Sequence, residues 1–370
     1  MRIIATSLAI LAAGLLNVAY AQQPAAPPLG LPPLPVPQDN QITPAKVELG
    51  DKLFHDERFS TDGKVSCATC HDAEKAFTDS PLPVSEGIDK KRGTRNAPTV
   101  VNAAYMQSQF WDGREPDLEG QSAGPFINPV EMGLADHTPI LKIVRADPAY
   151  KRMFKKAFNK SGQQITMKHV QQAIATFERT IVSGDSPFDR YYFAGDQRAM
   201  SKPAVRGLKI FLEQGRCVSC HTISQTHALF TDSRFHNLGI GFARINKDVT
   251  ELASAYRQAK RTMAQVDVDV LTNKNTSELG RFAVSSEFRD MGSFKTPTLR
   301  NVAKTAPYMH DGSLKTLKEV VDFYNNGGLV KKSDPLFDFQ SGGIRPLDLS
   351  EEEVADLVAF LEALTSPEYK

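Results

Sequence analysis

Two short cysteine motifs constrain this chain more than any other feature of its sequence. Cys67-Ala68-Thr69-Cys70-His71 and Cys217-Val218-Ser219-Cys220-His221 share the spacing C-x-x-C-H, and they hold all four cysteines of the 370 residues. A single motif of this kind also fits a redox dithiol or half of a zinc site. Two of them, with no other cysteine, are typical of covalent haem attachment, in which two thiols add to the haem vinyl groups and the adjacent histidine binds the iron. The sequence therefore predicts two haem c groups, attached through Cys67, Cys70, Cys217 and Cys220, with His71 and His221 as iron ligands.

The N-terminus has the pattern of a secretory signal. Arg2 precedes a mostly apolar stretch that ends near Val18, and Ala19-Tyr20-Ala21 places small residues where a signal peptidase cleaves. An uncleaved membrane anchor is the alternative, but the apolar run is short for a span. We expect residues 1–21 to be a signal peptide, cleavage between Ala21 and Gln22, and a periplasmic mature protein without a stable membrane span.

The charge balance excludes some classes of partner. The chain has 44 basic and 43 acidic residues, a formal net charge of +1. No basic excess indicates a nucleic-acid partner, and no acidic tail indicates a basic one.

Composition along the chain predicts a linker and two haem domains. Residues 22–42 are Pro-rich, with six prolines between Pro24 and Pro35, and such a stretch is expected to be an extended tether that does not pack. The folded part is expected from about Thr43. It divides into an N-terminal haem domain, 43–185, and a C-terminal haem domain, 200–366, each with one cysteine motif near its start.

Helical patterns dominate the rest of the chain. Apolar residues recur at three- and four-residue steps from Met167 to Ile181. Ser350 and Glu353 form a capping box ahead of an apolar face that extends to Leu364. Residues 203–213 also have helical character, whereas 72–100 and 222–250 read as long loops. The expected fold is mostly α-helical with long loops.

Several further motifs resemble the bacterial dihaem cytochrome c peroxidase and MauG family. They follow the family's order around both haem motifs and cover the chain after residue 43. The segments that carry the resemblance are Arg95-Asn96-Ala97-Pro98-Thr99, Phe110-Trp111-Asp112-Gly113-Arg114, Asn128-Pro129-Val130-Glu131-Met132, Lys295-Thr296-Pro297-Thr298-Leu299-Arg300-Asn301 and Ala306-Pro307-Tyr308-Met309-His310-Asp311-Gly312.

The resemblance implies two cytochrome c-like domains and a division of labour between the haems. The N-terminal haem would meet hydrogen peroxide, and the C-terminal haem would receive electrons and pass them across the interface. Trp111, the only tryptophan, matches the family residue that relays electrons between the haems. Its alternative is a buried core aromatic.

The resemblance also assigns residues to the peroxide pocket. Glu131 and Gln121 match distal positions, where a carboxylate carries the proton that moves between the peroxide oxygens and an amide orients the peroxide. Pro125 would form a neighbouring wall. Without the match, Glu131 would be read as a surface acid and Gln121 as a helix-capping residue.

A calcium ion between the domains is a further implication of the family match. Asn96, Thr305 and Pro307 match its ligands, one amide side chain and two main-chain carbonyls, which suit a hard cation. Ordinary turn residues are the alternative.

Two positions depart from the conventional peroxidase pattern. Gly87 stands where peroxidases that need reductive activation place a displaceable histidine, and no histidine lies between His71 and His137. Tyr324 stands where conventional peroxidases place a methionine ligand of the C-terminal haem. A tyrosine at this position resembles MauG, in which it is the iron ligand, and a phenolate ligand lowers the redox potential of the haem. The alternative for Tyr324 is a packed core aromatic. The ligand would then be sought among Met291, Met309, His227, His236 and His310.

These observations lead to the hypothesis of a MauG-like dihaem peroxidase. It would reduce hydrogen peroxide with electrons from a small cytochrome c, a cupredoxin or an oxidisable protein substrate. A conventional periplasmic cytochrome c peroxidase and a non-catalytic dihaem electron carrier are the alternatives. Because no histidine stands at the Gly87 position, the N-terminal haem is expected to have no protein ligand on its distal side. An acid and an amide beside this open iron argue against the carrier.

Overall fold

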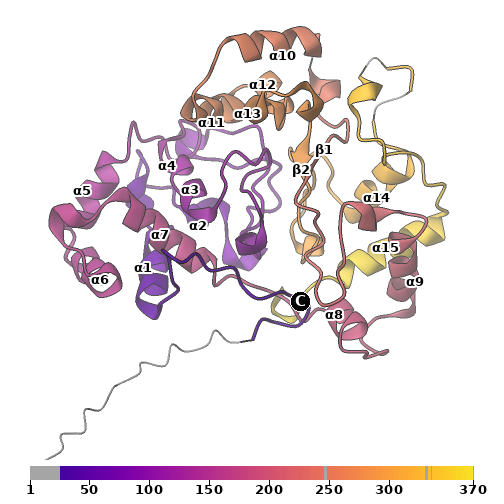
Figure 1. The fold of residues 1–370 in the computed structure, drawn as a ribbon, viewed down its shortest axis with the longest axis horizontal. Coiled ribbons are helices and arrows are strands. Elements are labelled where there is room, and N and C mark those ends of the chain that lie inside the picture. The colour runs from indigo at the N-terminus through magenta and orange to yellow at the C-terminus, as the bar shows by residue number, and fades with distance from the viewer. Residues whose placement is uncertain (1–25, 246–247, 330–331, 335, 370) are drawn as a thin grey trace, which may run out of the picture.

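The computed structural model describes residues 26–245, 248–329, 332–334 and 336–369, so the expected signal peptide and its cleavage site lie outside the described residues. The described chain is mostly helical with long loops, which confirms the predicted fold class (Figure 1). Its helices form an N-terminal lobe, a C-terminal lobe and a bridging layer that lies above both lobes in Figure 1. None of the described helices has the length and apolar character needed to cross a membrane.

The N-terminal lobe contains α1 (Pro44–Phe54), α2 (Cys67–Cys70), α3 (Leu118–Gln121), α4 (Gly124–Ile127), α5 (Thr138–Ala146), α6 (Pro148–Phe158) and α7 (Met167–Glu178). The C-terminal lobe contains α8 (Pro187–Tyr192), α9 (Lys202–Leu212), α14 (Leu317–Asn325) and α15 (Glu351–Glu362). The bridging layer contains α10 (Val249–Gln258), α11 (Met263–Thr272), α12 (Lys274–Glu278) and α13 (Phe282–Ser285).

The three helices predicted from periodicity are confirmed as α7, α9 and α15. The Ser350 and Glu353 capping box forms as expected, because the Ser350 backbone N–H donates to the Glu353 carboxylate at 2.8 Å and the Glu353 N–H donates to Ser350 Oγ at 3.3 Å. Short 3-10 turns interrupt the predicted loops, and α10 begins at the end of the second one.

The same helix crossing occurs in both lobes. In the N-terminal lobe α1 crosses α7 at Gly50, where a Cβ atom would lie 2.0 Å from the Ala173 carbonyl oxygen. In the C-terminal lobe α9 crosses α15 at Gly207, where a Cβ atom would lie 2.0 Å from the Asp356 carbonyl oxygen. The two lobes are therefore built on one plan, with a glycine at each crossing that lets the backbones approach.

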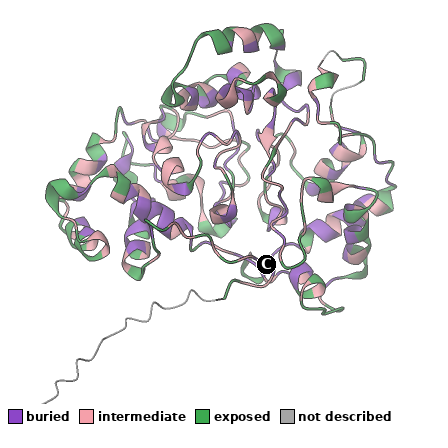
Figure 2. Ribbon diagram, in the orientation of Figure 1, coloured by how far each residue is buried: buried purple, intermediate pink, exposed green. Residues whose placement is uncertain are grey.

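Each lobe and the bridging layer has its own apolar core. Phe54 and Phe126 are fully buried in the first core, Phe211 and Phe360 in the second. The core of the bridging layer includes Phe282 and also packs against Val130 of the N-terminal lobe. Figure 2 shows the contrast between the largely buried α7 and the exposed outer face of α10.

A short antiparallel sheet lies between the lobes in the view of Figure 1. Strand β1 (Phe235–His236) pairs with β2 (Phe294–Lys295), with Phe235 opposite Lys295. The Lys295 backbone N–H donates to the Trp111 carbonyl oxygen at 2.7 Å. The two-stranded sheet thus attaches the C-terminal half of the chain to the segment that carries Trp111.

The Pro-rich segment is not a free tether in its described part. The Gly30 carbonyl oxygen accepts hydrogen bonds from the Ala228 N–H at 3.0 Å and from Arg300 Nη2 at 2.5 Å. Asn40 is fully buried and donates to the Gln172 carbonyl oxygen at 2.9 Å. The expectation that residues 22–42 do not pack is wrong for 26–42, because an extended chain presents its carbonyl groups to donors buried in the lobes.

Candidate active site

The N-terminal motif forms a single helical turn. Cys67 and Cys70 are the first and last residues of α2, so their side chains lie one turn apart on the same face. The Thr69 hydroxyl oxygen accepts from the Ser66 backbone N–H at 3.0 Å and holds the start of this turn. His71 follows at the end of the helix, and its Nδ1 lies 3.1 Å from the Phe77 carbonyl oxygen.

The C-terminal motif repeats this arrangement. Cys217 begins a 3-10 turn (Cys217–Ser219), Cys220 is the C-cap that follows it, and the Nδ1 of His221 lies 2.8 Å from the Phe230 carbonyl oxygen. A carbonyl oxygen only accepts hydrogen bonds, so Nδ1 carries the proton in both histidines and Nε2 keeps its lone pair for a metal. Burial lowers the pKa of both histidines, which favours this neutral form.

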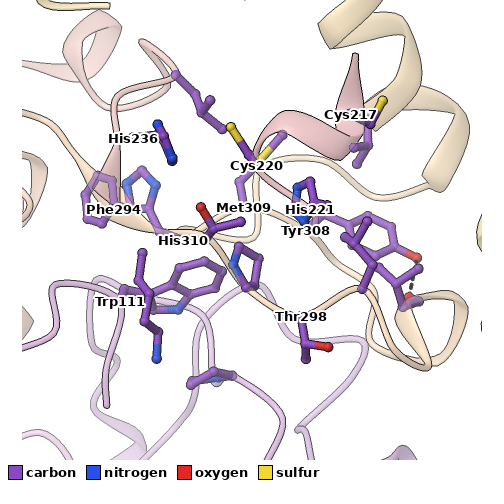
Figure 3. Close-up of a pocket in the computed structure, with 18 of the residues that line it drawn as sticks. Trp111, Cys217, Cys220, His221, His236, Phe294, Thr298, Tyr308, Met309 and His310 are labelled. Carbon is purple, nitrogen blue, oxygen red and sulfur yellow. Dashed lines mark hydrogen bonds between the residues drawn. The ribbon is translucent and has the colours of Figure 1, made fainter. Parts of the chain in front are cut away.

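A cavity of 670 Å³ lies beside the C-terminal motif. Cys217, Cys220 and His221 line it together with Trp111 (Figure 3). Tyr324 also lines it. This volume is within the usual range for a large cofactor. None of the four cysteines, all of which lie in the described part of the chain, is in a disulfide. Thiols at the right spacing, an imidazole with a free Nε2 and a mostly apolar wall fit a covalently attached haem.

Trp111 lies in this cavity wall and is held from both sides. Its indole Nε1–H donates to the Asn96 carbonyl oxygen at 2.9 Å, while its own carbonyl oxygen accepts from the Lys295 N–H of β2. The side chain of Lys295 is half-buried and donates to the Ser108 carbonyl oxygen at 2.6 Å. Trp111 therefore stands where the two halves of the chain meet.

The structure brings Gln121, Pro125 and Glu131 onto consecutive short segments. Gln121 ends α3, Pro125 is in α4, and Glu131 follows α4 in a turn closed by the Met132 N–H, which donates to the Pro125 carbonyl oxygen at 3.2 Å. The Glu131 carboxylate faces Cys70, whose pKa is raised first by burial and then by this carboxylate. The three residues thus lie on neighbouring segments, and the Glu131 carboxylate lies close to the N-terminal motif.

Burial sets the acidity of Glu131. It raises the pKa of the carboxyl to about 7; the Asp267 carboxylate acts in the same direction, while the Arg114 guanidinium opposes it. A carboxyl with this pKa can gain or lose a proton near neutral pH.

Gly87 packs directly on the Glu131 turn. A Cβ atom at Gly87 would lie 2.2 Å from the Val130 carbonyl oxygen, and the neighbouring Ile88 N–H donates to the Glu131 carbonyl oxygen at 2.8 Å. The segment that could carry a histidine instead supports the turn that carries Glu131.

Tyr324 lies near the end of α14 and lines the same cavity as His221. Burial raises the pKa of its phenol, and the two thiols of the motif add to this effect. Of the alternative ligands, Met309, His236 and His310 also line the cavity. The Nε2 atom of His236 lies 2.7 Å from Asp232, and that of His310 lies 2.8 Å from Glu278, so both imidazoles are engaged by carboxylates.

The remaining alternatives lie elsewhere. Met291 is fully buried in the core of the bridging layer, and the ring of His227 lies beside Thr226 in an exposed loop.

Asn96, Thr305 and Pro307 also line the 670 Å³ cavity. The Asn96 side-chain Nδ2 donates to the Pro83 carbonyl oxygen at 3.1 Å, which leaves its Oδ1 as an acceptor. The backbone N–H of Asn96 donates to the His310 carbonyl oxygen at 2.8 Å. The three residues are thus brought to one region between the halves, with oxygen donors that suit calcium.

The sequence reasoning missed Asp267 and Arg114. Arg114 belongs to the motif Phe110-Trp111-Asp112-Gly113-Arg114, but the sequence does not show that it is buried between two carboxylates, Asp112 and Asp267. Asp267 belongs to no motif and lies more than a hundred residues from Glu131 in sequence, so no local signal identifies it.

Comparison with known proteins identifies the family of this chain. The profile described as di-haem cytochrome c peroxidase matches residues 44–198. Cytochrome-c peroxidase IdrP1 of Denitromonas iodatirespirans is 36% identical over 100% of this chain and 94% of its own length. The methylamine utilization protein MauG of Methylorubrum extorquens is 36% identical over 90% of this chain and 81% of its own.

A solved structure agrees with these relatives. The structure of a MauG-like protein associated with microbial copper homeostasis superposes with a TM-score of 0.73 at 33% identity, covering 93% of this chain and 97% of that one. The relatives match this chain over nearly its whole length and not only around one haem motif. The chain therefore belongs to the di-haem cytochrome c peroxidase family, and it is a haem-dependent peroxidase with two haem c groups.

Proposed function

We propose that this peroxidase acts in the MauG-like manner, taking up hydrogen peroxide at the N-terminal haem without prior reduction. The observation that carries the proposal is the environment of Glu131, which lies half-buried near Cys70 and is supported by Gly87 where a displaceable histidine would otherwise stand. Each peroxide is reduced to two waters by two electrons and two protons. When bound, the two haems supply the iron that takes up peroxide and the second redox centre.

The protein residues manage the proton and the position of peroxide. Glu131 takes a proton from one peroxide oxygen and returns it to the departing oxygen, and a pKa of about 7 suits both transfers near neutral pH. Gln121 orients the peroxide by hydrogen bonding, and Pro125 limits the space beside it. Trp111, half-buried where the halves meet, relays electrons between the two sites.

Tyr324 is the feature that separates the MauG-like branch from conventional peroxidases. As a phenolate ligand with His221, it would lower the potential of the C-terminal haem. Its place in the cavity wall supports this role. Met309 lines the same cavity, and this observation favours the second candidate, a conventional cytochrome c peroxidase with a methionine ligand.

The remaining parts of the proposal concern location and partners. The expected signal peptide supports a periplasmic protein. The electrons would come from a small cytochrome c, a cupredoxin or an oxidisable side chain of a protein substrate. Calcium held by Asn96, Thr305 and Pro307 would join the two halves.

Mixing the fully ferric protein with hydrogen peroxide, without any reductant, tests the proposal. A rapid spectral change of both haems is expected for the MauG-like enzyme. A protein that reacts only after one-electron reduction is a conventional peroxidase. A fully reduced protein that fails to bind carbon monoxide has no open iron, and this result would instead identify an electron carrier.

A further inference from the structure

We propose that Asp267 of α11 is a positioning residue for the peroxide pocket. Its carboxylate fixes the turn that carries Glu131 and partly neutralises the Arg114 guanidinium beside that turn. The inference rests on the role proposed for Glu131. It assigns a function to the bridging layer, which no haem motif or pocket motif includes.

Asp267 contacts two segments of the pocket at once. Its Oδ1 accepts a hydrogen bond from Arg114 Nε at 2.8 Å, and its Oδ2 accepts one from Asn128 Nδ2 at 3.0 Å. The side chain is only 16% exposed. A Cβ atom at Gly124, the residue before Pro125, would lie 3.6 Å from the Asp267 carboxylate. The carboxylate therefore links the segments that carry Trp111, Pro125 and Glu131.

Asn128 transmits this contact to Glu131. Asn128 is fully buried, and its Oδ1 accepts from the Val130 N–H at 3.1 Å. Its carbonyl oxygen accepts from the N–H groups of Glu131 at 3.1 Å and Gly133 at 2.9 Å. The Asn128 amide thus faces Asp267 with its nitrogen and the Glu131 turn with its oxygen, so the carboxylate fixes the orientation of the amide and hence the turn.

The bridging layer is itself held firmly against the N-terminal lobe. Thr94 Oγ1 donates to the Val270 carbonyl oxygen at 2.6 Å, and Arg95 Nη2 donates to the Ser277 carbonyl oxygen at 2.9 Å. Glu278 of the same layer pairs with His310 of the C-terminal half at 2.8 Å. Asp267 is therefore presented from a scaffold that contacts both halves.

Within the described part of the chain, few charged groups face Glu131. They are Asp267 on α11, Arg114 after Trp111, and the Cys67 and Cys70 thiols of α2, which no longer titrate once they are thioethers. Arg114 is held by Asp267 and by Asp112, and its Nη2 is buried without a hydrogen bond among the described residues. Loss of the Asp267 charge would remove one repulsion and leave Arg114 less neutralised, and both changes favour the Glu131 carboxylate.

The test compares two isosteric variants of the holoprotein. Asp267→Asn removes the charge but keeps the shape and an acceptor. Asp269→Asn is the control, because Asp269 lies on the same helix and pairs with the partly exposed Arg261. The protonation of Glu131 is followed by its infrared carboxyl band, identified by its loss in Glu131→Gln. The rate of reaction with peroxide is measured across the same pH range.

Asp267→Asn is expected to move the midpoint of the infrared titration about one pH unit lower. The midpoint of the rate profile should move with it, and Asp269→Asn should match the wild type. An unchanged infrared midpoint in Asp267→Asn overturns the inference. The infrared result is independent of catalysis, so a wild-type rate in Glu131→Gln would refute the role of Glu131 without deciding the effect of Asp267.

Asp267→Glu is the second test of the positioning role if the Asp267→Asn variant fails to fold. It keeps the charge but cannot reach Arg114 and Asn128 in the same geometry. We expect an infrared midpoint close to the wild type, with faster hydrogen exchange at the Val130 and Glu131 amides. Wild-type exchange at these two amides would contradict the positioning role.

Discussion

The acidity of Glu131 depends on neighbours from distant parts of the chain. Burial dominates, and Asp267 and Arg114 act in opposite directions on a pKa of about 7. If the carboxylate is the form that accepts the proton from peroxide, the rate should rise with pH through this value. We expect Glu131→Gln to slow the reaction about 10²–10⁴-fold and to abolish this pH dependence, while both haems stay attached. Stopped-flow measurements with peroxide would show it, and a wild-type rate would exclude Glu131 from proton transfer.

Tyr324 gives a second prediction at the residue scale. Tyr324→Phe keeps the ring that packs against the C-terminal core but removes the oxygen proposed to bind iron. The ferric spectrum of the C-terminal haem should lose its His/Tyr low-spin signature, while the free energy of unfolding changes by only about 1 kcal/mol. Electron paramagnetic resonance measures the ferric low-spin signature, and chemical denaturation measures the free energy of unfolding. An unaltered ferric spectrum would reduce Tyr324 to a packing residue and return attention to Met309.

At the scale of elements, the crossing of α9 and α15 depends on the absence of a side chain at Gly207. A Cβ atom there would lie 2.0 Å from the Asp356 carbonyl oxygen, so the two helices would have to separate. Alanine favours a helix over glycine by about 1 kcal/mol, but overpacking of this kind costs about 1–3 kcal/mol or more. We expect Gly207→Ala to lower the thermal unfolding midpoint. Gly342→Ala is the control, because no atom of the described residues lies within 4 Å of a Cβ atom at that exposed position. Equal unfolding midpoints for the two variants would contradict the argument.

At the scale of the whole molecule, the two halves of the chain meet at the cavity lined by Trp111, Asn96, Thr305 and Pro307. If calcium joins these residues, its removal should weaken the coupling between the haems without releasing either one, because the thioether bonds are unaffected. A chelator-treated protein should show altered haem potentials in a redox titration and slower reaction with peroxide, both restored by added calcium. Identical titrations before and after exhaustive chelation would exclude a functional calcium site.

The bridging layer shows why local patterns were insufficient for part of the fold. Residues Val266 to Val270 alternate apolar and acidic side chains, a period typical of a strand. They nevertheless form α11, since the Thr262 and Gln265 capping box starts a helix and the core of the layer buries Val266 and Val270. Tertiary packing overrides the local period here.

The sequence by itself determined the features that depend on local covalent spacing. The C-x-x-C-H motifs specify haem attachment because both thiols and the histidine must lie within one turn, and the Ser350 capping box depends on residues three positions apart. Only the tertiary structure decided which distant groups meet. Examples are Asp267 beside Asn128, the Gly30 carbonyl against Arg300, and the close backbone approach at Gly50. These contacts join residues far apart in the chain, and their energy arises from burial and hydrogen bonding in the folded state, which leaves no periodic trace in the sequence.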